Sequence, residues 1–174
     1  MNRRNVIRNV IIISTGASLL PACTTTDEST LTLKNIPLTG PQEKMLAELA
    51  ETIIPKTPGV TGAKELKSHE FLLIMIDDCA VPEQQQLFTS GMKAFEDACR
   101  DKFNSPFVKC SAEQKNELLK EMETIKDKNN AAAGFYKTVK RYTIQSFTSS
   151  KPFLLDIKKW KMAPGNAFKG CVPV

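Results

Sequence analysis

Apolar residues recur every three to four positions along most of this chain, which is the period of a helix that buries one face. The first such segment begins at Thr39-Gly40-Pro41-Gln42, a capping-box pattern, and ends before Pro55. Its apolar face contains Met45, Leu46, Leu49, Ile53 and Ile54. A helix of this kind must pack its apolar face against other elements, so the pattern already favours a helical domain with a single core.

Three later segments have the same period. The segment that begins at Pro82 contains Leu87, Phe88, Gly91, Met92, Phe95, Cys99 and Phe103. The segment behind a second capping box, Ser111-Ala112-Glu113-Gln114, contains Leu118, Leu119, Met122 and Ile125. The last segment contains Phe135, Tyr136, Val139, Tyr142, Thr143 and Phe147. Each pattern predicts an amphipathic helix whose apolar face is part of the core.

The run Phe71–Ile76 is apolar throughout, and its periodicity fits either a buried strand or a buried helix. Its polar flanks and the lack of a second strand candidate favour the helix. The sequence therefore predicts an all-α fold, a small helical domain of about five helices. Beyond Pro152 we expect an irregular C-terminal tail.

The chain opens with MNRRNVIRNVIIISTGASLLPAC, which has the features of an export signal. Arg3, Arg4 and Arg8 supply the basic region, and the apolar stretch that follows is too short for a permanent membrane span. Adjacent arginines resemble signals of the twin-arginine route, which carries folded proteins. An ordinary signal for general secretion is the alternative.

The end of this segment, Leu20-Pro21-Ala22-Cys23, resembles a bacterial lipobox, which predicts that Cys23 is lipidated. A stretch rich in Thr and Ser follows, as expected of a flexible linker. We therefore divide the chain into a signal peptide at 1–22, a lipid-anchored linker at 23–38 and a helical domain at 39–174. The mature protein is expected in the periplasm or cell envelope, anchored to a membrane.

The basic charge of the whole chain comes largely from this signal. The chain has 24 Lys and Arg and 19 Asp and Glu, and three arginines leave with residues 1–22, so the net charge falls from +5 to +2. A charge this small gives no reason to expect a nucleic-acid partner.

Residues that could carry chemistry are few. The chain contains one histidine, His69, and its position in a first helical turn favours a solvated or capping role. Asp77-Asp78 and the pair Glu121 and Glu123 are expected on solvated faces, because neighbours on a helix point to different sides. The sequence has no dinucleotide or haem-attachment motif. We therefore predict no catalytic, cofactor-binding or metal-binding residues in this chain.

Lys137, Lys140 and Arg141 form a small cationic group, for which an ordinary solvated face is the simplest interpretation and a docking surface the alternative.

The four cysteines other than Cys23 allow three pairings in an oxidising compartment. A helix from Pro82 to Cys99 would carry Cys99 about 25 Å from the Cys79 end, much farther than the under-7 Å separation that a bridge allows. Cys99 and Cys110 flank a connection between two helices and could close it. This leaves Cys79 for Cys171, which would hold the tail against the body.

Several segments in order resemble the gluconate 2-dehydrogenase subunit 3 family, over a range from about Met45 to the C-terminus. They are Ile53-Ile54-Pro55 with Gly62-Ala63, the segment from Phe135 to Val139 that leads to Thr143, and Gly170-Cys171. The tail departs from the family pattern at WKMAPGNAF, where only Pro164-Gly165 is kept.

The resemblance implies a non-catalytic small subunit of an exported, flavin-dependent sugar or sugar-acid dehydrogenase. Such subunits accompany a large flavoprotein of the glucose-methanol-choline oxidoreductase type, often with a cytochrome c subunit, so FAD is expected in the partner. They can also carry the export signal for that partner. A free-standing envelope lipoprotein that binds a ligand or acts as a scaffold is the main alternative, and a stand-alone enzyme built around His69 is the least favoured.

Overall fold

The computed structural model describes residues 29–127 and 129–159. Within them the chain forms five α-helices, namely α2 (Gly40–Ile53), α3 (Ser68–Cys79), α4 (Pro82–Phe103), α5 (Ala112–Thr124) and α6 (Ala131–Ser149). There are also two short helical turns. The 3-10 turn η1 (Phe107–Lys109) lies between α4 and α5, and the π-helical turn η2 (Phe153–Ile157) follows α6. These described ranges contain no strand beyond an isolated bridge between Thr57 and Val60, so the all-α prediction is confirmed.

Helix starts follow the capping signals in the sequence. The Gln42 side chain accepts the backbone N–H of Thr39 at 2.9 Å, at the start of α2. At the start of α5, Gln114 and Ser111 form both hydrogen bonds of the capping box, at 2.9 and 3.3 Å. Each cap satisfies amides that have no partner inside the helix, so the polar residues fix where the helices begin.

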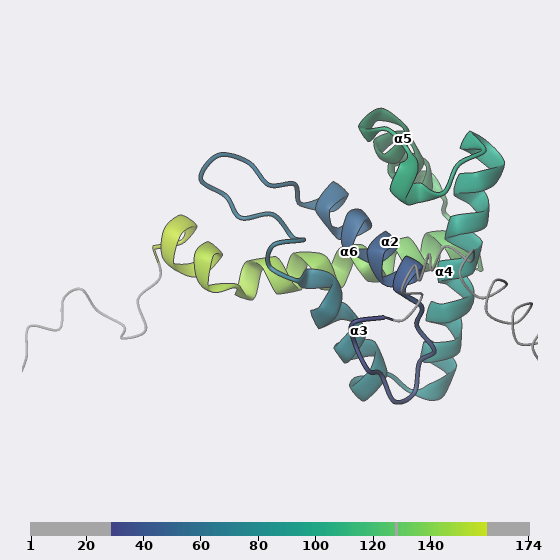
Figure 1. The fold of residues 1–174 in the computed structure, drawn as a ribbon, viewed down its shortest axis with the longest axis horizontal. Coiled ribbons are helices and arrows are strands. Elements are labelled where there is room, and N and C mark those ends of the chain that lie inside the picture. Colours follow the sequence, from purple (N-terminus) through teal and green to yellow (C-terminus); the bar gives the residue numbers. More distant parts are fainter. Residues whose placement is uncertain (1–28, 128, 160–174) are drawn as a thin grey trace, which may run out of the picture.

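Helix α6 lies along the long axis of the domain and contacts each of the other four α-helices (Figure 1). Its most extensive partner is α4, which crosses the N-terminal half of α6. Gly91 makes this crossing close, since a Cβ atom there would lie 2.7 Å from the Ala131 carbonyl oxygen and 2.8 Å from Phe135 Cβ. Only a residue without a side chain fits at this distance.

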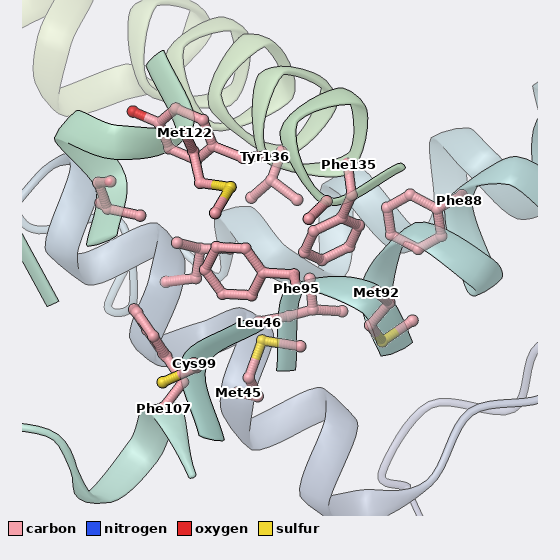
Figure 2. Close-up of a cluster of buried hydrophobic side chains, with 14 of the residues drawn as sticks. Met45, Leu46, Phe88, Met92, Phe95, Cys99, Phe107, Met122, Phe135 and Tyr136 are labelled. Carbon is pink, nitrogen blue, oxygen red and sulfur yellow. The ribbon is translucent and has the colours of Figure 1, made fainter. Parts of the chain in front are cut away.

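All five α-helices and η1 contribute to the core, and Figure 2 shows the part of it where α2, α4, η1, α5 and α6 meet. Phe95 lies at its centre, with ring centroids 5.3 Å from Phe107 and 5.5 Å from Phe135. Phe88 extends the same stack, 5.2 Å from Phe135. Aromatic pairs at these separations add to the stabilisation from burial, which is about 1.5–3 kcal/mol for a large apolar side chain.

Residues 29–38 form a looped, non-helical segment that packs on the helices, which we call the N-terminal strap (Figure 1). Ile36 is buried, and Leu31, Leu33 and Leu38 are partly buried against the core. The folded body thus includes residues that the sequence analysis assigned to a flexible linker. The apolar side chains in this stretch are too irregularly spaced to suggest a helix, yet they pack against the core.

Three further expectations need correction. Leu87 is 67% exposed and not part of the core, because it lies about 100° around α4 from Phe88. Within the run 71–76, Ile74 is 46% exposed, so α3 has one solvent-facing apolar position. Residues after Pro152 are not wholly irregular, since Phe153–Ile157 forms a π-helical turn whose Phe153 ring packs 5.1 Å from Phe147.

Candidate functional site

Four of the predicted site residues lie outside the described part of the chain. These are the export-signal residues Arg3 and Arg4, the lipidation candidate Cys23 and the disulfide candidate Cys171. Their roles stay predictions. Among the described residues no helix is both long and apolar enough to span a membrane.

Cys99 and Cys110, the predicted disulfide pair, lie close together, and the bond between them stays a prediction. Their sulfur atoms lie 3.5 Å apart in a buried position, where both are thiols. Burial, with the hydrogen-bonding contact to Cys110, raises the pKa of the Cys99 thiol to about 12. The nucleophilic thiolate is therefore scarce at this position. Cys79 is exposed at the end of α3, and its predicted partner Cys171 falls beyond the described residues.

His69 is not a solvated residue, contrary to the sequence-based expectation. It is only 9% exposed, and its Nδ1 atom has no hydrogen-bond partner among the described residues. Burial lowers the pKa of its imidazole, against the opposing influence of Glu70 and Glu43. The Glu43 carboxylate itself accepts a hydrogen bond from the Thr30 backbone N–H at 2.6 Å and another from the Thr30 hydroxyl. His69 is therefore a neutral core residue beside the strap.

Asp77 also differs from the expectation of a solvated carboxylate. It is 4% exposed and accepts backbone N–H groups of the strap from Lys34, Asn35 and Ile36, at 2.8, 2.7 and 3.0 Å. Burial disfavours its charge, but these three hydrogen bonds outweigh burial and lower the pKa of Asp77. Asp77 is thus a structural residue that caps the strap.

The neighbouring Asp78 is exposed as predicted, 4.0 Å from Lys34 Nζ.

The pair Glu121 and Glu123 lies on solvated faces, as predicted. Glu121 pairs with Lys102 at 2.7 Å, and Glu123 pairs with Lys140. The cationic group of α6 is therefore partly neutralised within the chain. Lys137 donates to the Ile125 carbonyl oxygen at 2.9 Å, whereas the Arg141 guanidinium lies over the Tyr142 ring, 4.6 Å from its centroid. The described residues contain no group of three or more His, Cys, Asp or Glu that could hold a metal ion.

An open groove of about 460 Å³ lies between the end of α3, the start of α4 and the first half of α6. We call it the α3/α4/α6 groove. Its walls include Leu87, Phe88, Gly134, Thr138, Arg141 and Tyr142. Sequence reasoning missed it, because Leu87 was placed in the core. Its exposure could have been predicted from a helical wheel, because Leu87 lies about 100° from the centre of the buried face of α4.

The described residues form a small all-α domain with an open, largely apolar groove between α3, α4 and α6. The chain belongs to the gluconate 2-dehydrogenase subunit 3 family, whose family model matches residues 41–165. No match was found among curated proteins or among solved structures.

The structure explains two of the segments that carry this resemblance. The Ala63 backbone N–H donates to the Ile54 carbonyl oxygen at 3.0 Å, and Ala63 is fully buried. The segments Ile53-Ile54-Pro55 and Gly62-Ala63 are therefore neighbours, and the loop between them closes on the end of α2.

Proposed function

We propose that this chain is the non-catalytic small subunit of an exported, FAD-dependent sugar or sugar-acid dehydrogenase. It assists export and maturation of a large flavoprotein of the glucose-methanol-choline oxidoreductase type and anchors that flavoprotein at a membrane. FAD and the catalytic residues belong to the large subunit. A cytochrome c subunit that takes the electrons completes the complex.

The observation that carries this proposal is the family match over residues 41–165, in a chain that begins with the features of an export signal. A family named for the third subunit of a dehydrogenase implies other subunits in the same complex. A flavoprotein that folds around FAD in the cytoplasm must be exported in its folded state. The adjacent residues Arg3 and Arg4 resemble the signals of the twin-arginine route, which exports folded proteins. Lipid on Cys23 would hold the complex at a membrane face.

Replacing both Arg3 and Arg4 by lysine tests the carrier role. Lysine keeps the positive charge that general secretion uses and removes the arginine pair. We expect the flavoprotein of the complex to stay in the cytoplasm and dehydrogenase activity to be lost from the envelope fraction. Arg8→Lys is the matched control, because it makes the same exchange outside the pair and should leave export unchanged. A flavoprotein that reaches the envelope in the double variant contradicts the carrier role.

Cys23→Ser tests the anchor separately from export. Without the cysteine no lipid can be attached, so the complex should move from the membrane fraction to the soluble periplasmic fraction with its activity intact. Activity that remains with the membranes would show that another subunit supplies the anchor. A chain that purifies from the envelope without any flavoprotein supports the alternative, a free-standing lipoprotein.

A further inference from the structure

The α3/α4/α6 groove has an apolar wall that the described part of the chain leaves uncovered. Leu87 is 67% exposed there, the highest value among the large hydrophobic residues of the described ranges. The groove is also lined by Phe88 and Ile76, which are buried in the core and only 3% and 4% exposed, and by the partly buried ring of Tyr142. An exposed leucine at the edge of an open, largely apolar groove is typical of a surface that a protein partner covers.

Gly134 lies in the same groove and is exposed, and the packing of this chain does not account for a glycine there. A Cβ atom built at Gly134 would meet nothing within 4 Å, whereas one at Gly91 would collide with α6. Gly91 is thus explained by the crossing of α4 and α6, and Gly134 is not explained by any contact among the described residues. A helical glycine permits another backbone to approach closely, and here that backbone would come from outside the fold.

The charge in the groove indicates what kind of partner fits. Arg141 lies at the groove with its guanidinium over the Tyr142 ring, and no carboxylate of the described residues pairs with it. Lys140, the preceding residue, does have such a partner in Glu123. A carboxylate supplied by a partner would complete a charge-assisted hydrogen bond with Arg141. Residues 160–174 contain Lys161 and Lys169 and no acidic side chain, so no side chain of this segment could form that pair with Arg141.

We propose that the α3/α4/α6 groove binds an apolar segment of the large flavoprotein subunit that carries an Asp or Glu side chain. The carboxylate pairs with Arg141, the apolar side chains cover Leu87, and the backbone of the segment approaches Gly134. Arg and aromatic residues at the centre of an apolar contact are the usual binding hot spots. This inference rests on the proposed function for the identity of the partner.

Two substitutions test the groove in the complete complex. Gly134→Leu fills the groove, and Arg141→Glu reverses the charge that selects a carboxylate. Both positions are exposed, and the space at Gly134 is open, so the chain should fold normally. The matched controls are Asn116→Leu and Lys120→Glu, which make similar changes at exposed positions of α5 outside the groove.

The measurement is the amount of FAD-containing subunit that co-purifies from the envelope with each tagged chain. We expect each groove variant to retain less than a tenth of the wild-type amount, and both controls to retain most of it. If the groove variants co-purify as much flavoprotein as the wild-type chain, the groove is not the binding site, and the proposed function stays intact. A wild-type chain that co-purifies no flavoprotein overturns both. If the two control variants lose the flavoprotein as well, the effect is not specific to the groove, and the assignment of the groove as the binding site is overturned.

A photo-cross-linking residue in place of Leu87 identifies the occupant directly. We expect a cross-link to an apolar peptide of the large subunit that contains Asp or Glu. A cross-link to residues 160–174 of the same chain, or to a second copy of the chain, overturns the proposal.

Discussion

The backbone N–H of Ile36 donates a hydrogen bond to the carboxylate of Asp77 at 3.0 Å, and this contact joins two segments that lie 41 positions apart in the sequence. Lys34 and Asn35 donate to the same carboxylate. The Asn35 side chain also donates to the Asp77 carbonyl oxygen at 2.8 Å. One buried acidic residue thus holds the N-terminal strap on α3.

Asp77→Asn should therefore destabilise the domain. The change removes the charge and leaves an amide nitrogen facing backbone donors, so we expect a loss of about 1–3 kcal/mol in the free energy of unfolding. Asp78→Asn is the matched control, because its side chain is exposed and the change should stay within about 0.5 kcal/mol. Urea unfolding followed by circular dichroism measures the free energy of unfolding of each variant. Equal losses in Asp77→Asn and Asp78→Asn would contradict the role of Asp77 in holding the strap.

The same contact predicts a loss of stability in acid. The folded state holds the pKa of Asp77 below the value of about 3.9 expected in the unfolded chain. The stabilisation is therefore complete above that unfolded value and is lost as the pH falls through the folded pKa. Below pH 4 the wild-type protein and Asp77→Asn should converge in stability, which denaturant melts at several pH values measure. A difference that stays constant down to pH 2 would contradict this.

His69 predicts a second pH dependence, at higher pH. Burial lowers its pKa below the unfolded value of about 6.5, so the unfolded chain binds a proton more readily than the folded one. Stability should therefore fall as the pH drops through 6.5 towards the folded pKa. The nearby carboxylates Glu43 and Glu70 oppose this shift, and Lys67 and Lys64 support it. His69→Gln should flatten the stability profile between pH 7 and 5, whereas an unchanged slope would rule out His69 as its source.

The two helical glycines predict opposite effects of the same substitution. Gly91→Ala places a methyl group 2.7 Å from the Ala131 carbonyl oxygen, so we expect a loss of about 1–3 kcal/mol as α4 and α6 separate. Gly134→Ala meets no atom, so it should raise the stability by up to about 1 kcal/mol through the better helix propensity of alanine. Thermal unfolding of the isolated chain measures both, and a destabilised Gly134→Ala would show a role for this glycine within the fold.

The cysteines predict a selective pattern of reactivity. Iodoacetamide should modify the exposed Cys79 in the native reduced protein and reach Cys99 and Cys110 only after unfolding, because Cys99 is buried and its pKa is raised to about 12. Mass spectrometry of tryptic peptides measures the modification of each residue. Rapid labelling of Cys99 in the folded protein would contradict this.

A disulfide between Cys99 and Cys110 remains our prediction for the protein in an oxidising compartment. During refolding with oxidised glutathione, the two thiols lose two protons and two electrons as the S–S bond forms, and the oxidant is reduced to two molecules of glutathione. Trypsin cuts between the two cysteines, so an unreduced digest should contain the joined peptides. Closing this short loop should add about 2–4 kcal/mol. A digest that links Cys99 to Cys171 would contradict the pairing.

The helices could be predicted from the sequence because their signals are local. The Ser111 and Gln114 side chains cap backbone amides of their own helix, and the spacing of Phe88, Met92, Phe95 and Cys99 follows from the helical period alone. The closeness of Cys99 and Cys110 was also predictable, because they flank a single short connection.

The roles of Asp77, His69 and Leu87 were decided only by the tertiary structure. An acidic residue beside another acidic residue on a helix looks solvated, and nothing in its neighbours shows that a strap 41 positions earlier will bring backbone donors to it. His69 is buried although it lies in a first helical turn, and Leu87 is exposed because α3 and α6 leave a groove at the start of α4. Local hydrogen bonds and periodicity specify the helices. The burial of a side chain depends instead on which surfaces of the fold meet, and the sequence pattern of a single helix does not specify those contacts.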